Sequence, residues 1–261
     1  MRKVINLAEP ILKVSGLCTE FRTVDSVVRA VDGVDLELYA GETLGIVGES
    51  GCGKSVTALS IMQLLQKGVG RVVEGEILFD GKDMLKLSQN ELLALHGRDM
   101  AMIFQEPMTS LNPVFTIGYQ LSEVLRYHKG MKKKEALAKS IELLKDVGIS
   151  RPEMIVNNYP HELSGGMLQR VMIAMGLSCD PKLLIADEPT TALDVTVQAQ
   201  IMRLFKEVNR KYGVAVLFIS HDLKVVYQLC DNIMIMEKGR IIKKGTDEEI
   251  IHSDFFKLSH E

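Results

Sequence analysis

The stretch Gly48-Glu49-Ser50-Gly51-Cys52-Gly53-Lys54-Ser55 follows the apolar run Thr43–Val47 and leads into a helix predicted from about Lys54 to Leu65. It fits the pattern G-x-x-x-x-G-K-[ST], whose glycines let the backbone wrap a phosphate chain with its N–H groups pointing inward. The start of the helix adds partial positive charge. Lys54 can reach the β- and γ-phosphates, and the Ser55 hydroxyl can ligate Mg²⁺. In this strand–loop–helix setting the pattern predicts a phosphate site rather than an ordinary glycine-rich turn. The predicted contacts are Gly48, Ser50, Gly51, Cys52, Gly53, Lys54, Ser55 and Val56.

A second chemical signal lies at the end of the apolar run Leu183–Ala186, where Asp187 and Glu188 follow directly. A carboxylate at the end of a buried strand can hold Mg²⁺ directly or through water, and we expect Asp187 to do so. Because side chains alternate along a strand, Glu188 points elsewhere, toward the γ-phosphate and a water molecule that it could orient or deprotonate. The alternative is that the two acidic residues merely cap a loop. The presence of the phosphate loop argues against this alternative.

The spacing of apolar residues divides the chain into three parts. Up to about residue 90 it favours strands, as in the alternation of Val34, Leu36 and Leu38. From about residue 91 to residue 179, apolar residues recur mainly at helical spacings. After residue 180, short runs such as Val214–Ile219 are typical of buried parallel strands. We expect one domain over residues 1–261, with a core and β subdomain at about 1–90 and 180–261 and a helical subdomain at about 91–179.

Composition excludes several classes of protein. The 261 residues are enough to bury a large core. Lys and Arg together number 31 against 34 for Asp and Glu, so no global basic surface favours nucleic acid. The four cysteines form no CxxC pair, which argues against a zinc site or a disulfide framework. The N-terminal segment does not resemble a signal peptide, and the apolar runs are shorter than the roughly 20 residues of a membrane span.

A further glycine-containing segment, Leu163-Ser164-Gly165-Gly166-Met167-Leu168-Gln169-Arg170, precedes the acidic pair. Ser164 is a favourable N-cap residue, and its hydroxyl together with free N–H groups at the helix start would make a second anion site. One phosphate loop already serves one nucleotide, so a second phosphate-binding helix start is best used by another chain. A plain helix N-cap is the alternative for these residues taken alone.

These motifs, in this order, resemble those of ABC-type ATPases, and the segment around Ser164 resembles that family's LSGGQ signature with Met167 in place of the commonest glutamine. The resemblance covers the chain from about Ile11 to Ile251. It implies an α/β fold: a P-loop NTPase (RecA-like) core with an N-terminal antiparallel β subdomain and a helical insertion, the ABC ATPase fold. It also implies a dimer in which ATP and Mg²⁺ lie between the phosphate loop of one subunit and Ser164-Gly165-Gly166 of the other.

The same resemblance implies further site residues. Gln105, in Phe104-Gln105-Glu106-Pro107, resembles the Q-loop glutamine, which touches Mg²⁺ or the attacking water. Asp194 resembles the D-loop aspartate that reaches across the dimer. His221 follows a predicted buried strand, at the sheet edge where ligands bind, and resembles the switch histidine that contacts the γ-phosphate. Taken alone, each could be an ordinary loop or helix-start residue. The predicted catalytic residues are Glu188, His221 and Gln105, and the predicted metal ligands are Ser55, Gln105 and Asp187.

The residue that would stack on adenine is less clearly marked. Phe21, an aromatic residue before the phosphate loop, is our candidate. Tyr39 is a rival, and a core phenylalanine is the structural alternative for Phe21.

Within the family, segments 104–113, 164–167 and 187–196 resemble the ATPases of oligopeptide, dipeptide and nickel importers. This implies a subunit that hydrolyses ATP to power uptake of peptides, nickel or other small solutes, bound peripherally at the cytoplasmic face of the membrane. The implied partners are a second ATP-binding subunit, identical or paralogous, two transmembrane permease subunits and, indirectly, an extracytoplasmic solute-binding protein. A soluble ABC-type ATPase outside any transporter is the alternative. Many relatives hold an iron–sulfur cluster in a C-terminal extension, and we expect none here because no cysteine follows Cys230.

The residues after Gln105 give a hypothesis for contact with a permease. Phe115 beside Pro113, together with nearby methionines such as Met108, could form an apolar groove for a helix of the membrane subunit.

Overall fold

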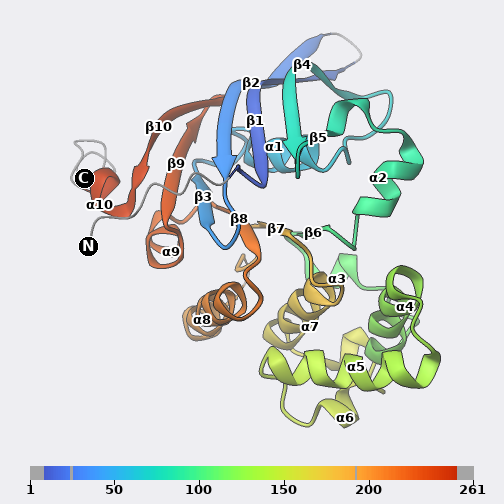
Figure 1. The fold of residues 1–261 in the computed structure, drawn as a ribbon. Helices are drawn as coiled ribbons and strands as arrows, with labels where there is room; N and C mark the ends of the chain where they lie inside the picture. Colours follow the sequence, from blue (N-terminus) through green and yellow to red (C-terminus); the bar gives the residue numbers. More distant parts are fainter. Residues whose placement is uncertain (1–8, 24–25, 192, 252–261) are drawn as a thin grey trace.

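The computed structural model describes residues 9–23, 26–191 and 193–251. These residues form two β-sheets with helices around them (Figure 1). The larger sheet has the strand order β10-β9-β3-β8-β7-β6. Neighbouring strands are parallel except for the antiparallel pair β9 and β10. The strands are β3 (Thr43–Val47), β6 (Met100–Ile103), β7 (Leu183–Asp187), β8 (Ala215–Ser220), β9 (Asn232–Glu237) and β10 (Arg240–Thr246).

The smaller sheet is antiparallel and has the order β2-β1-β4-β5. Its strands are β1 (Leu12–Arg22), β2 (Val27–Leu38), β4 (Gly70–Phe79) and β5 (Lys82–Asp83). Helix α1 (Lys54–Ile61) contacts strands of both sheets and shares one buried cluster with them. The predicted α/β fold with an N-terminal antiparallel part is therefore confirmed.

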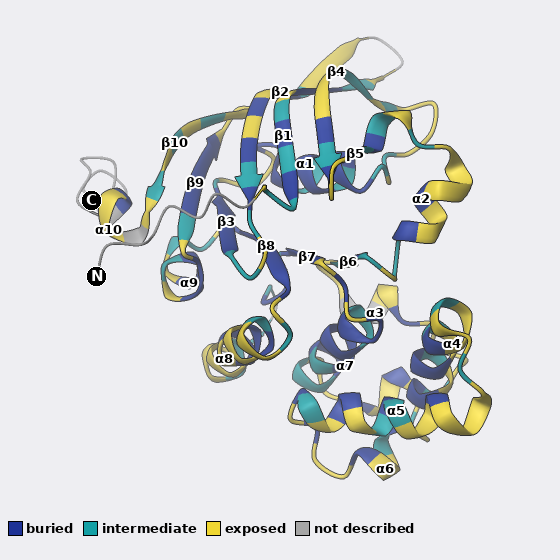
Figure 2. Cartoon of the chain, viewed as in Figure 1, coloured by how far each residue is buried: buried dark blue, intermediate teal, exposed yellow. Residues whose placement is uncertain are grey.

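The central strands of the larger sheet are apolar except at their ends, because both of their faces are covered. In β8, Ala215, Leu217 and Ile219 belong to the buried cluster that includes α1. Val216 and Phe218, which alternate with them, belong to the cluster on the opposite face, which includes α7. Figure 2 shows β8 as a buried strand. Burial on both faces explains why its sequence lacks the polar alternation of a half-exposed strand.

The segment between β5 and β7 is mainly helical. It contains α2 (Gln89–Leu95), α3 (Pro107–Ser110), α4 (Ile117–Lys129), α5 (Lys133–Asp146), α6 (Pro152–Ile155) and α7 (Gly165–Leu177). Figure 1 shows α4, α5 and α6 away from the sheets, with α7 between them and the larger sheet. The last three helices are α8 (Val195–Tyr212), α9 (Leu223–Leu229) and α10 (Asp247–Ile251), and short 3₁₀ turns cover Met84–Lys86 and Pro160–Glu162. No helix within the described ranges is long and apolar enough to cross a bilayer.

Two local features differ from the sequence-based expectation. Met100–Ile103 forms the edge strand β6 of the larger sheet, although mainly helix was expected from about residue 91. Its four residues pair in parallel with β7, and such a short apolar run has no period of its own that separates strand from helix. Helix α1 ends at Ile61 rather than near Leu65, because Gln63 adopts a φ of 52°, in the left-handed region that ends helices.

Candidate active site

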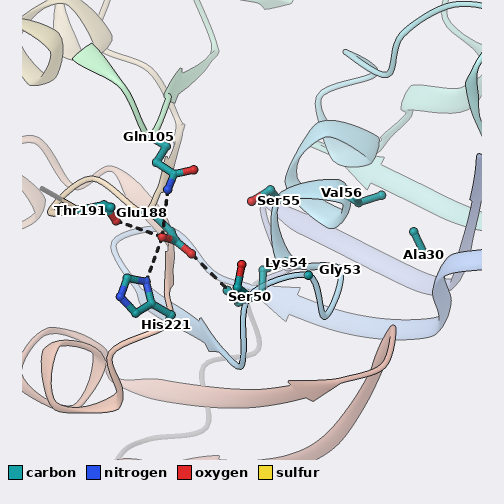
Figure 3. A pocket seen from close by; sticks show the side chains of 11 residues that line it. Ala30, Ser50, Gly53, Lys54, Ser55, Val56, Gln105, Glu188, Thr191 and His221 are labelled. Carbon is teal, nitrogen blue, oxygen red and sulfur yellow. Dashed lines mark hydrogen bonds and ion pairs between the residues drawn. The ribbon is translucent and has the colours of Figure 1, made fainter. Parts of the chain in front are cut away.

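A cavity of about 400 Å³ lies where β3 leads into α1 (Figure 3). The carboxyl ends of β3, β6, β7 and β8 meet at this edge because all four strands run parallel, so residues far apart in the sequence come together. The lining residues are Ala30, Ser50, Gly51, Gly53, Lys54, Ser55, Val56, Gln105, Glu188, Thr191 and His221. Three of them, Gln105, Glu188 and His221, are the predicted catalytic residues.

The phosphate loop, residues 48–55, has glycine at positions where its backbone packs closely against the backbone of other segments. Gly53, the N-cap of α1, has a φ of 109°, which favours glycine. A Cβ atom there would lie 2.4 Å from the carbonyl oxygen of Ala30, and one on Gly48 would lie 2.2 Å from that of Met236. Gly48 and the buried Cys52 are absent from the cavity lining, and their phosphate contacts stay predictions. The other predicted phosphate contacts, Ser50, Gly51, Gly53, Lys54, Ser55 and Val56, line the cavity.

Lys54 places its ammonium group inside the loop. Nζ donates hydrogen bonds to the carbonyl oxygens of Gly48 and Glu49, both at 2.8 Å, and lies 3.9 Å from Oε1 of Glu188. The side chain is only 4% exposed, so these partners are what compensates its loss of water. A buried ammonium at a helix start is chemically suited to an anionic phosphate.

Ser55 and Asp187 join the start of α1 to the end of β7. The Ser55 hydroxyl donates a 3.0 Å hydrogen bond to Oδ1 of Asp187. Burial raises the pKa of Asp187, the charge of Glu188 acts in the same direction, and Ser55 and Lys54 oppose both. A hydroxyl and a carboxylate are the oxygen ligands that Mg²⁺ prefers, and a cation would offset the cost of the buried charge. The two residues therefore fit a magnesium site.

The carboxylate of Glu188 contacts several other side chains of the site. Its Oε2 accepts hydrogen bonds from Nε2 of Gln105 at 3.3 Å and from the Thr191 hydroxyl at 3.0 Å. Nδ1 of His221 lies 2.9 Å from the same oxygen (Figure 3), and it must carry a proton to donate to a carboxylate. The carboxylate is thereby held between the three side chains and the ammonium of Lys54. An oriented carboxylate beside a phosphate site can act as a general base.

The backbone at Glu188 explains how two consecutive acidic residues both serve this region. Strand β7 ends at Asp187, and Glu188 adopts a φ of 47°, an uncommon value for a residue with a side chain. Its N–H donates a 2.9 Å hydrogen bond to the carbonyl oxygen of Ile219, at the end of β8. The chain therefore leaves the strand geometry on which the expected alternation was based. Such backbone conformations are typical of functional sites.

The segment 163–170, called the signature segment below, lies apart from the cavity lining. Ser164 is the N-cap of α7, and its hydroxyl accepts a hydrogen bond from the Met167 N–H at 3.4 Å. Asp194 is the N-cap of α8, and its Oδ1 accepts one from the Val197 N–H at 2.9 Å. Neither residue lines the cavity, nor do Gly165 and Gly166, and both caps are exposed. Ala192, within the segment 187–196 on which part of the sequence resemblance rests, lies outside the described residues.

The two aromatic candidates for adenine stacking also lie outside this lining. Phe21 is a residue of β1, and a Cβ atom on Gly70 would meet its ring at 2.9 Å. The Tyr39 hydroxyl donates a 3.1 Å hydrogen bond to Glu37. The adenine contact therefore stays a prediction.

Two lining residues had no predicted role. Thr191 lies within the segment 187–196 without a predicted role of its own, and its hydroxyl contacts Glu188. Its position three residues after Glu188 is a usable signal, because a turn can bring residues at this spacing together. Ala30 has no such signal, since its place in the lining depends on how β2 approaches the phosphate loop.

The amino-acid sequence is similar to those of known transport proteins. Residues 31–191 match the family model described as ABC transporter. The oligopeptide transport ATP-binding protein AppD of Bacillus subtilis is 52% identical over 240 residues, which cover 92% of this chain and 73% of that protein. The dipeptide transport ATP-binding protein DppD of the same organism is 51% identical over 244 residues, covering 94% of this chain and 73% of that protein.

Solved structures show the same fold. The dimeric structure of MJ0796, described as a bacterial ABC transporter cassette, superposes with a TM-score of 0.80 at 27% identity, covering 90% of this chain and 98% of that one. CbiO1 from Clostridium perfringens, part of the transporter complex cbiONQ, gives a TM-score of 0.79 at 28% identity and covers 97% of this chain and 94% of its own.

Proposed function

Because this chain belongs to the ABC transporter family of ATPases, we propose that it powers the uptake of peptides through a membrane importer, with Glu188 as the catalytic base. The observation that carries the catalytic assignment is the convergence of Gln105, Thr191 and His221 on one carboxylate oxygen of Glu188, next to the ammonium of Lys54.

The chemistry of each residue follows from its position. Lys54 and the start of α1 bind the phosphates of ATP. The Glu188 carboxylate accepts a hydrogen bond from the attacking water and aligns it in line with the γ-phosphate. His221 and Gln105 hold that carboxylate, and His221 would also contact the γ-phosphate of bound ATP.

Ser55 and Asp187 would hold Mg²⁺, with Gln105 as a third ligand. The ion supplies charge neutralisation of the β- and γ-phosphate oxygens when it is bound. The Ser55–Asp187 hydrogen bond keeps these two oxygen ligands together in advance.

Two subunits would complete two ATP sites. Ser164, Gly166 and Asp194 lie at exposed helix starts away from the cavity of their own chain, so they are available to a nucleotide held by another subunit. The cassette MJ0796, which this chain resembles, is described as dimeric, and one of its structures as bound to ADP and Pi. A chain of this kind would close around ATP as a dimer, identical or paralogous, and open after hydrolysis.

The cargo is assigned from the relatives. The proteins named above act in oligopeptide and dipeptide transport, and they are 52% and 51% identical to this chain over the aligned residues. This favours a peptide importer over a soluble ATPase outside any transporter. Two transmembrane permease subunits would form the route for the cargo, a solute-binding protein would deliver it, and this subunit would sit peripherally at the cytoplasmic face.

An exposed aromatic surface is the place where a permease would dock. It consists of Phe115 and Tyr119, 41% and 44% exposed, with the neighbouring Val114 at 69%. The rings of Phe115 and Tyr119 stack with centroids 4.7 Å apart, and these residues lie 10 and 14 positions after Gln105 in the chain. A helix of the membrane subunit that binds here would be connected to Gln105 through the chain segment between them. Gln105 in turn contacts Glu188.

The substitution Glu188→Gln tests this function. It keeps the size of the side chain and removes the basic carboxylate, so ATP should still bind while kcat falls by a factor of about 10² to 10⁴. Gel filtration with ATP should show a stable dimer, because the step that releases it is blocked.

The matched control is Glu207→Gln, the same chemical change on the exposed face of α8. It should hydrolyse ATP like the wild type and show no persistent dimer. Wild-type turnover in Glu188→Gln, or the absence of a dimer with ATP, would contradict the assignment.

A further inference from the structure

The starts of α7 and α8 pack directly against each other. Gly166 is the second residue of α7, and a Cβ atom on it would lie 2.6 Å from Cγ1 of Val197, in the first turn of α8. Such an approach is shorter than any ordinary carbon–carbon contact, so a methyl group does not fit between the helices here. Valine is branched at Cβ and has one strongly preferred rotamer in a helix, so it cannot easily turn aside.

Gly165, the neighbouring glycine, has room for a side-chain carbon. A Cβ atom on Gly165 would lie 3.6 Å from Cδ2 of Leu193, which is an ordinary van der Waals contact. Packing within the chain therefore demands glycine at position 166 and not at position 165.

A second contact joins the same two helices one turn further along. Nη2 of Arg170 donates a 3.1 Å hydrogen bond to Oε1 of Gln200, and Nη1 donates a 2.6 Å bond to the carbonyl oxygen of Val147, just after α5. Arg170 follows Gly166 by four residues and Gln200 follows Val197 by three, so each pair shares one face of its helix. The first two turns of α7 and α8 are thus joined as one unit.

Val197 links this unit to the cap of α8. Its backbone N–H donates to Oδ1 of Asp194 at 2.9 Å, while its side chain meets Gly166. One residue therefore touches both of the segments that carry the exposed caps Ser164 and Asp194.

We propose that Val197 is a positioning residue that sets the spacing between the signature segment and Asp194, and that position 166 is glycine because Val197 fills the space of its Cβ. This inference rests on the proposed function, in which both segments serve a nucleotide held by a second subunit. The competing explanation is that the Gly166 backbone itself must approach that nucleotide closely. Under that explanation, a smaller residue at 197 would bring no relief.

A double substitution separates the two explanations. Gly166→Ala should lower the kcat of the full chain about tenfold or more, and adding Val197→Ala should restore it to within about threefold of the wild type. The KM for ATP should change little in either variant, because the phosphate loop is untouched. A merely structural defect would instead lower the melting temperature and the fraction of active protein, without lowering the kcat of each folded molecule.

The matched control combines Gly166→Ala with Val208→Ala, which removes the same atoms from a buried position of α8 about three turns away. No restoration is expected there. If Gly166→Ala proves poorly folded, the same comparison is made on melting temperature, which Val197→Ala should recover and Val208→Ala should not.

Wild-type kcat in Gly166→Ala, no recovery with Val197→Ala, or equal recovery with Val208→Ala would overturn the proposal. A failure of the proposed function appears separately, as the absence of an ATP-dependent dimer in Glu188→Gln.

Discussion

Asp187 shows how a single residue can be unfavourable for folding and required for chemistry. Its carboxylate is buried, and burial raises its pKa, as does the nearby charge of Glu188. A group whose pKa is raised on folding contributes stability below its unfolded-state pKa and loses that contribution as the pH rises through the folded value. At neutral pH the charged Asp187 therefore costs stability, which a bound cation would offset.

We expect Asp187→Asn to raise the melting temperature of the nucleotide-free protein by a few degrees at neutral pH. The amide oxygen can still accept the hydrogen bond from Ser55. The difference in melting temperature between the variant and the wild type should become smaller as the pH falls toward 3.8, the ordinary pKa of aspartate. Added Mg²⁺ and ATP should stabilise the wild type and not the variant. Thermal unfolding across this pH range checks the prediction, and a variant less stable than the wild type at pH 7 would contradict it.

A second prediction at this scale concerns the role of Lys54 in ATP binding. Lys54→Ala should weaken ATP binding by about 10- to 100-fold, the worth of a charge-assisted hydrogen bond, and turnover should be lost with it. Isothermal titration with ATP measures the first effect and a phosphate-release assay the second. Lys67→Ala, at an exposed lysine shortly after α1, should bind ATP as the wild type does.

At the scale of elements, the helical part is tied to the core by polar contacts as well as by packing. The Tyr212 hydroxyl, at the end of α8, donates a 2.6 Å hydrogen bond to Oδ2 of Asp146, at the end of α5. Nζ of Lys211 lies 2.8 Å from Oδ1 of the same carboxylate. Burial opposes the charge of Asp146, but its bonds to Lys211 and Tyr212 prevail and lower its pKa. With the bond from Arg170 to Val147, the end of α5 is held at two points.

We therefore expect Tyr212→Phe to lower the free energy of unfolding by about 1 kcal/mol, the usual worth of one hydrogen bond. The ring that packs against the core is retained. Urea unfolding measures the change, and Tyr127→Phe, at a tyrosine that is 76% exposed, should stay within about 0.5 kcal/mol of the wild type. If both substitutions change the free energy of unfolding equally, the hydrogen bond from Tyr212 to Asp146 does not stabilise the fold.

At the scale of the whole molecule, the chain carries parts of two different sites. The cavity gathers the phosphate loop, Glu188 and His221, whereas Ser164 and Asp194 lie at exposed helix starts outside it. The aromatic surface that includes Phe115 and Tyr119 is a third exposed feature. Under the proposed function, a second ATP-binding subunit and a permease would complete these features.

Removal of both rings tests the docking surface. Phe115→Ala with Tyr119→Ala should weaken association with the permease by about thirtyfold or more, because exposed aromatic residues that become buried are typical binding hot spots. Co-purification of the membrane complex reports the loss. Tyr127→Ala, at the other end of α4, should co-purify normally, and normal assembly of the double variant would place the docking surface elsewhere.

Local residue spacing was enough to identify the phosphate loop, the acidic pair and the α/β class. Each of these signals lies within about ten residues, and its meaning depends on the neighbours in the chain: glycines for the loop, an apolar run before Asp187, and unbroken apolar strands where both sheet faces are buried. The ABC-type architecture came from a resemblance of several such motifs in order, and the fold bears it out.

Other features depended on contacts between distant parts of the chain. Gln105 and His221 meet at one oxygen of Glu188 only because β6, β7 and β8 run parallel and end at the same edge. The strand β6 exists because β7 pairs with it, and the demand for glycine at Gly166 exists because Val197 packs there. Such pairings bring together residues from separate elements, so no local period or propensity encodes them.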